Sequence, residues 1–82
     1  MESKFDTLTD LQKAVLLDIL KEEKCQRGFI SYSNVFWFGD NQGKIKGSSY
    51  TAGIASLQRK GVIVCNKFSK CVKEINDSYR PN

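Results

Sequence analysis

The chain has 82 residues, a net charge of +4 and a pI near 9.1, which suits one small domain with a modest core. It contains no histidine, so the commonest general base and the commonest metal ligand are both missing. Its three cysteines, Cys25, Cys65 and Cys71, form no Cys-x-x-Cys pair, and its carboxylates are scattered along the chain. We therefore predict that the protein is not an enzyme and has no catalytic residue, metal site or cofactor.

The positive charge is concentrated in the second half of the chain. Residues 1–40 hold five Lys/Arg and seven Asp/Glu, whereas residues 41–82 hold eight and two. This asymmetry is typical of proteins that neutralise phosphates, although a solvated basic face would give the same composition. The N-terminus has no apolar signal segment, no apolar run is long enough to span a membrane, and three cysteines fit a reducing compartment. These features predict a cytoplasmic protein with no membrane contact.

The first predicted element is an amphipathic helix that begins near Thr9 and ends near Lys24, after a flexible tail at residues 1–6. Thr9 and Gln12 have the spacing of a capping box, in which each side chain binds the other residue's backbone N–H. Apolar residues then recur at helical spacing and mark the buried side: Leu8, Leu11, Val15, Leu16, Ile19 and Leu20. The intervening polar residues are expected on the solvent side: Asp10, Gln12, Lys13, Asp18, Lys21 and Glu22.

The segment that follows this helix has two interpretations. Phe29-Ile30 resembles a short strand, and Ser31 or Ser33 would then cap a second helix at residues 32–38. Because the aromatic residues of that helix favour strands, residues 34–46 are also compatible with a hairpin. We favour the helix, followed by an exposed, mobile loop at residues 39–43. Its aromatic cluster fits either a core or a stacking platform for unpaired bases: Tyr32, Phe36, Trp37 and Phe38.

Residues 48–60 form the predicted third helix. Ser48 or Ser49 would cap it, and Gly61 would end it after a basic last turn. One face carries Tyr50, Ile54 and Leu57, and the opposite face carries Ser49, Thr51, Ala52, Ala55, Gln58 and Arg59.

A β-hairpin is predicted to follow, with strands at residues 62–66 and 71–75 and its tip at residues 67–70. Cys65 and Cys71 would then face each other across the hairpin. Residues 77–82 should form a second flexible tail.

The third helix and the following strand resemble the recognition helix and first wing strand of winged helix-turn-helix proteins. The resemblance rests on Ile54, Leu57, Gly61, Val62 and Ile63, with Ser48, Ser49 and Thr51 at the helix start. The predicted order of helix, short strand, helix, helix and hairpin also matches this superfamily. It implies an α+β fold with three helices and a C-terminal β-hairpin wing, over one domain at residues 1–82. The connection at residues 39–47 is longer than is usual between the second and third helices.

The resemblance implies a duplex DNA-binding protein that uses the helix at residues 48–60 and the wing at residues 66–70. Its role would be transcription regulation or replication of a mobile element, similar to small phage or plasmid regulators. The short side chains on the helix predict modest sequence specificity. The expected DNA-binding residues are Lys44, Lys46, Ser48, Ser49, Thr51, Ala52, Gln58, Arg59, Lys67 and Lys70.

Two other functions remain open at this point. One is a winged-helix module that binds a protein partner, as an adaptor or inhibitor. The other is binding of single-stranded DNA through Trp37 and Phe68. A homodimer is the alternative to a monomer.

Overall fold

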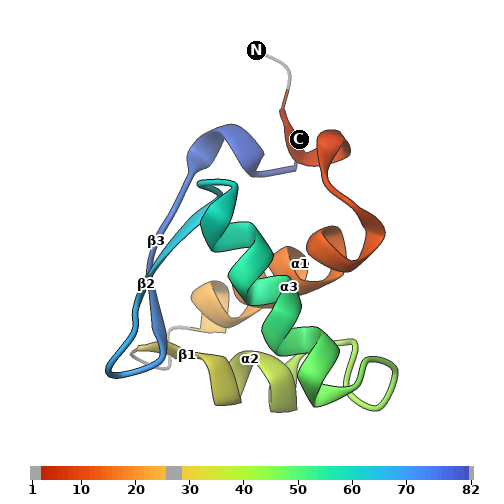
Figure 1. Ribbon diagram of the computed structural model, residues 1–82, viewed down its shortest axis with the longest axis vertical. Helices are drawn as coiled ribbons and strands as arrows, with labels where there is room; N and C mark the ends of the chain where they lie inside the picture. Colours follow the sequence, from red (N-terminus) through yellow and green to blue (C-terminus); the bar gives the residue numbers. More distant parts are fainter. Residues whose placement is uncertain (1–2, 26–28, 82) are drawn as a thin grey trace.

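The computed structural model describes residues 3–25 and 29–81, which form an α+β fold of three α-helices and a three-stranded antiparallel sheet. The helices pack together beside the long hairpin of the sheet (Figure 1). In chain order the elements are the 3-10 helix η1 (Phe5–Thr7), α1 (Asp10–Cys25), β1 (Ile30–Ser31), α2 (Tyr32–Phe38), α3 (Gly47–Arg59), β2 (Ile63–Asn66), β3 (Cys71–Ile75) and the 3-10 helix η2 (Asp77–Tyr79).

Helix α1 begins with the predicted capping box. The backbone N–H of Thr9 donates to Oε1 of Gln12 at 2.9 Å, and the N–H of Gln12 donates to Oγ1 of Thr9 at 3.2 Å. The predicted apolar side is buried, and Val15, Leu16 and Ile19 have no exposed surface. These residues form the centre of one core to which all three helices, β2 and β3 contribute.

The predicted solvent side of α1 is partly wrong. Gln12, Asp18 and Glu22 are all less than 10% exposed, at 7%, 2% and 4% respectively. Helix α3 covers one flank of α1, where Nε2 of Gln12 donates to Oγ of Ser56. The connection between α2 and α3 covers another flank and donates to Asp18. Because two neighbours cover α1, its buried surface is wider than its apolar stripe.

Residues 32–38 form a helix, so the hairpin alternative for residues 34–46 is wrong. Ser31 caps α2, and its Oγ accepts the backbone N–H of Asn34 at 3.1 Å. Burial of Val35 and the edge-on contact of Phe36 with Tyr50, 5.1 Å between ring centroids, stabilise this helix against its strand preference. Trp37 and Phe38 are more than half exposed, so only part of the aromatic cluster belongs to the core.

The connection between α2 and α3 is anchored to α1, although Asp40, Gln42 and Gly43 are exposed as we predicted. The backbone N–H of Asp40 donates to Oδ1 of Asp18 at 3.0 Å, and Nδ2 of Asn41 donates to Oδ2 at 3.0 Å. Gly39 and Asn41 are accordingly half-buried. A Cβ on Gly39 would lie 2.5 Å from the carboxylate of Asp18, so only glycine fits here.

Helix α3 packs its predicted face on α1 but begins earlier than expected. Its N-cap is Lys46, without a side-chain cap bond, so the capping role predicted for Ser48 or Ser49 is wrong. A Cβ on Gly53 would lie 3.0 Å from Cγ2 of Val15, which shows how closely α1 and α3 approach. Gly61 ends the helix region with a φ of +80°, as the sequence predicted.

The sheet places β3 between β1 and β2. Cys65 is opposite Val72, and Cys71 is opposite Asn66, so the two cysteines do not face each other as we expected. The tip at residues 67–70 makes Asn66 and Cys71 the closing pair of the hairpin. None of the three cysteines, all of which lie in the described residues, forms a disulfide.

The C-terminal segment is packed on α1, which differs from the flexible tail that we predicted for residues 77–82. Arg80 forms a two-pronged ion pair with Glu23, with N–O distances of 2.8 and 3.0 Å. The backbone N–H of Lys4 donates to the carbonyl of Ser78 at 2.8 Å, so residues near the two chain ends lie side by side. Residues 1, 2 and 82 lie outside the described part of the chain.

Candidate nucleic-acid interface

The predicted recognition face of α3 is on the surface of the molecule. Tyr50, Ile54 and Leu57 are at most 3% exposed against the core, which turns the opposite face outward. The small and polar residues of that face are exposed at both ends of the helix and half-buried near its middle. The exposed ones are Ser48, Ser49, Thr51, Ala52 and Arg59, and the half-buried ones are Ala55 and Gln58.

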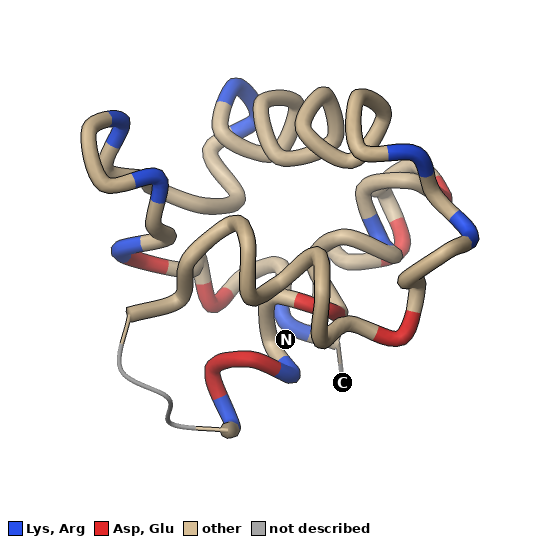
Figure 2. The backbone as a smooth tube through the Cα atoms, turned by 90° about the horizontal axis from the view of Figure 1, so that it is seen from below, with Lys and Arg blue, Asp and Glu red and all other residues tan. Residues whose placement is uncertain are grey.

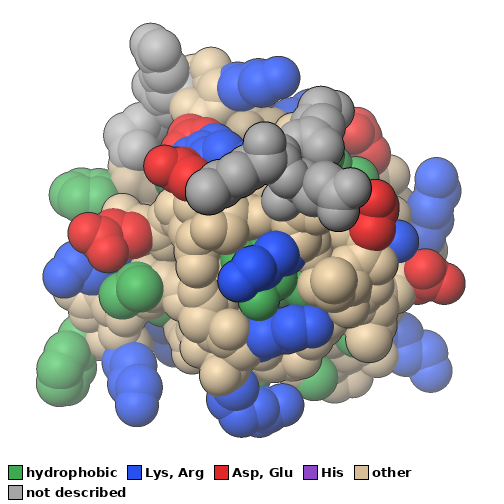
Figure 3. Space-filling model, turned by 90° about the horizontal axis from the view of Figure 1, so that it is seen from above, with side chains coloured by type: hydrophobic (Ala, Val, Ile, Leu, Met, Phe, Trp, Pro, Cys, Tyr) green, Lys and Arg blue, Asp and Glu red, His purple; other side chains and the backbone are tan. Residues whose placement is uncertain are grey.

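Lysine and arginine residues surround this face. Residues 41–73, which include α3 and the hairpin tip, contain seven Lys/Arg and no Asp/Glu. Basic residues lie at both ends of α3, and others lie in the hairpin to one side of it (Figure 2). Seen from the end that bears the chain termini, the lower edge, which is the α3 side, shows several basic and some hydrophobic side chains but no acidic one (Figure 3). All seven are exposed: Lys44, Lys46, Arg59, Lys60, Lys67, Lys70 and Lys73.

The lysines at the N-terminal end of α3 belong to a segment that is hydrogen-bonded to α1. Lys44 and Lys46 follow Asn41, whose side chain is bound to Asp18 of α1. Lys46 is also the N-cap of α3, and its carbonyl accepts the backbone N–H of Tyr50 at 2.9 Å. The burial of Tyr50, and after it the carboxylate of Asp18, raises the pKa of the Tyr50 hydroxyl well above its ordinary value of 10. This hydroxyl therefore stays a hydrogen-bond donor that fixes α3 and Lys46 relative to α1.

Two polar side chains of the predicted face bind within the protein. Nε2 of Gln58 donates to the hydroxyl of Tyr32 at 2.9 Å, and Oγ1 of Thr51 donates to the carbonyl of Gly47 at 3.0 Å. Burial, and after it the neighbouring Cys65, raises the pKa of Tyr32 to about 12, so Tyr32 remains neutral at physiological pH. Gln58, one of the expected DNA-binding residues, thus links α3 to α2.

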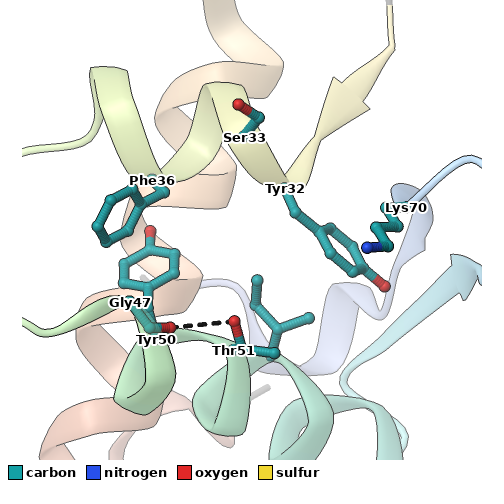
Figure 4. A pocket seen from close by; sticks show the side chains of 8 residues that line it. Tyr32, Ser33, Phe36, Gly47, Tyr50, Thr51 and Lys70 are labelled. Carbon is teal, nitrogen blue, oxygen red and sulfur yellow. Dashed lines mark hydrogen bonds between the residues drawn. The ribbon is translucent and has the colours of Figure 1, made fainter.

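A groove of about 390 Å³ lies between α2 and α3, and Lys70 of the hairpin tip also lines it. The rings of Phe36 and Tyr50 lie at one end of it, and Tyr32 and Lys70 lie at the other (Figure 4). Thr51 of α3 lies between them, and Ile54 of α3 also lines the groove. Lys70 and the first half of α3 therefore line the same groove.

The hairpin tip has a defined conformation. Oδ1 of Asn66 accepts the backbone N–H groups of Phe68, at 2.9 Å, and Ser69, at 3.3 Å. The N–H of Tyr32 donates to the carbonyl of Lys70 at 2.9 Å and ties the tip to α2. Lys70 has a φ of 51°, in the left-handed region that favours glycine or asparagine. These bonds fix the backbone of the tip on which Lys67 and Lys70 stand.

The structure gathers the predicted site residues into three groups. Lys44, Lys46, Ser48, Ser49, Thr51 and Ala52 lie at the start of α3, Gln58 and Arg59 at its end, and Lys67 and Lys70 in the hairpin tip. Our prediction omitted Lys60 and Lys73, although the acid-free stretch that contains them is visible in the sequence. Lys60 donates from Nζ to the carbonyl of Thr7 at 3.3 Å, and Lys73 is exposed on β3.

Residues 3–25 and 29–81 contain no group of three or more His, Cys, Asp or Glu side chains placed to hold a metal ion. Over the same residues, no helix is both long enough and apolar enough to cross a membrane. Comparisons with protein-family models, with curated proteins and with solved structures gave no match.

Proposed function

We propose that this protein is a small winged-helix protein that binds duplex DNA with α3 and the tip of the β2–β3 hairpin. The observation that carries the proposal is the acid-free stretch at residues 41–73, whose exposed cations surround the exposed face of α3. The winged-helix assignment is supported by the order α1–β1–α2–α3–β2–β3, which matches that of the superfamily that the sequence resembles.

In this binding mode α3 enters the major groove, which is wide enough to admit a helix. Lys67 and Lys70 contact phosphates on one side of the helix, and Lys44 and Lys46 contact phosphates near its start. Ser48, Ser49 and Ala52 are short, so they allow a close approach that positions the protein without reading bases. Arg59 is long enough to reach a base edge, whereas the side chain of Gln58 is bound to Tyr32. We therefore expect modest sequence specificity.

We further propose that the protein uses this binding in transcription regulation, as small phage or plasmid regulators do. This step rests on analogy with the superfamily, because a fold hosts many functions.

Charge reversal tests the proposal. We expect the variant K44E/K46E/K67E/K70E to lose binding to random duplex, measured by fluorescence anisotropy over a range of salt concentrations. Each pair alone, K44E/K46E or K67E/K70E, should reduce the slope of log K against log salt by roughly 0.9 for each phosphate that the protein no longer neutralises.

The matched control is K4E/K24E, which reverses two exposed lysines outside the acid-free stretch. It changes the net charge by the same amount as either pair and should leave the slope close to that of the wild type. Unchanged duplex binding by the fourfold variant would contradict the proposed surface.

A protein-interaction module is the second candidate, because α2 ends in exposed aromatic side chains. Trp37 is 57% exposed and Phe38 is 54% exposed. Failure of the wild type to bind either duplex or single strand at low salt would favour this adaptor or inhibitor role. Trp37 also lines a shallow pocket with Lys44 and Lys46. Because it is the only tryptophan in the chain, quenching of its fluorescence by oligo-dT would instead indicate single-strand binding.

A further inference from the structure

Phe68 projects from the hairpin tip with its whole side chain in solvent. Its relative exposure is 101%, the highest among the exposed large hydrophobic residues. A phenylalanine in this position makes no use of the favourable free energy of burying its ring. It therefore contributes little to the stability of the isolated domain, and its ring is free to be buried in a partner.

The tip presents this ring on a constrained backbone. Asn66 accepts the backbone N–H of Phe68 itself, and the carbonyl of Lys70 is bound by the N–H of Tyr32. Binding would therefore cost little backbone entropy at Phe68, which is the advantage of a preorganised contact.

The charge around Phe68 favours nucleic acid over an apolar pocket in a protein. Lys67 precedes the ring and Lys70 follows it, and no acidic residue lies between residue 41 and residue 73. Lys70 occupies a left-handed conformation that is costly for a side chain, at a φ of 51°. In such an arrangement the aromatic ring can contact stacked bases, while the cations on either side of it contact the phosphates of the two backbones.

We propose that Phe68 is an apolar wedge that enters the minor groove and partly unstacks one base step, so that the protein bends the duplex. The proposal rests on duplex binding through α3. With α3 in the major groove, the tip lies beside the helix, because Lys70 lines one end of the groove between α2 and α3. The tip then reaches across one sugar-phosphate backbone to the adjoining minor groove. Apolar wedges of this kind kink DNA by roughly 20–90° toward the major groove.

The experiment measures the end-to-end distance of a short duplex by fluorescence resonance energy transfer between dyes at its two ends. We expect the wild type to raise the transfer efficiency on binding. Phe68→Ala should bind without raising it, because no base step is unstacked. Its affinity should be roughly tenfold weaker, because the lost burial of the ring outweighs the saved cost of unstacking. Phe68→Leu, which keeps an apolar wedge, should restore most of the bend.

Salt dependence separates the wedge from the lysines beside it. Phe68→Ala removes no charge, so its plot of log K against log salt should run parallel to that of the wild type, whereas Lys67→Ala should flatten the plot. Leu17→Ala, which truncates another exposed apolar side chain on α1, should leave both affinity and bend unchanged.

The outcomes distinguish the two proposals. Binding by the wild type with no bend, or with a bend that Phe68→Ala retains, would overturn the wedge and leave the proposed DNA-binding function in place. Absence of duplex binding by the wild type at low salt would overturn both the wedge and the proposed DNA-binding function. It would indicate that the tip binds a protein partner. Because the ring is fully exposed, Phe68→Ala should melt at the temperature of the wild type, which excludes misfolding as a cause.

Discussion

The hydroxyl of Tyr50 donates to Oδ2 of Asp18 at 2.8 Å in the interior of the protein. The same carboxylate accepts the backbone N–H of Asp40 and the side chain of Asn41. Asp18 thus joins α1, the α2–α3 connection and α3 at one point. The position of the basic residues near the start of α3 depends on this point, because Lys44 and Lys46 lie between Asn41 and Tyr50.

Tyr50→Phe should therefore destabilise the protein. It removes a donor to a buried carboxylate while keeping the ring, and we expect a decrease of about 1–3 kcal/mol in the free energy of unfolding. Urea denaturation followed by circular dichroism would measure this decrease. Ser49→Ala, next in the chain but exposed, is the control and should change stability by less than about 0.5 kcal/mol. Equal stability of Tyr50→Phe and the wild type would contradict the proposed role of this hydrogen bond.

Alkaline pH should weaken the fold through Tyr32. Its pKa is raised from 10.0 to about 12, first of all by burial. Between these values the unfolded chain loses the phenolic proton while the folded chain keeps it, so stability is complete below pH 10 and falls as the pH rises toward 12. Tyr32→Phe has no proton to lose and should show a shallower decline. Thermal unfolding of both proteins between pH 9 and pH 12 checks this, and equal slopes would contradict it.

Gly39 and Gly47 offer a matched pair of substitutions. A Cβ at Gly39 would lie 2.5 Å from the side chain of Asp18 and 2.6 Å from the carbonyl of Val35, whereas a Cβ at Gly47 would meet nothing within 4 Å. We expect Gly39→Ala to destabilise the fold by about 1–3 kcal/mol through overpacking. Gly47→Ala should be neutral or stabilising by up to about 1 kcal/mol, because alanine favours the helix. Chemical denaturation measures both, and a smaller effect at Gly39 than at Gly47 would be inconsistent with this packing.

Much of the fold was predictable because its signals are local. The spacing of Tyr50, Ile54 and Leu57 identified the buried face of α3, and Gly61 identified its end. The capping box at Thr9 and the strands around residues 67–70 were also predicted, and the structure confirms them.

The errors have a common physical origin in tertiary contacts. Asp18 looks like a solvent-facing residue on an amphipathic helix, and only the approach of the α2–α3 connection buries it. Ser48 and Ser49 have the right chemistry for a cap, but α3 already begins at Gly47. For the candidate site, the periodicity of apolar residues predicted that the opposite face of α3 would be exposed. The hydrogen bond between Gln58 and Tyr32 could not be predicted in this way, because it joins residues that are 26 positions apart.

The pairing of Lys4 with Ser78, reinforced by Arg80 on Glu23, leaves both ends of the described chain on one side of the molecule. The hairpin tip lies at the opposite end (Figure 1). A fluorophore, affinity tag or surface tether attached at either terminus would therefore point away from Lys67, Phe68 and Lys70. The protein can be immobilised by its ends with the hairpin tip still facing solution.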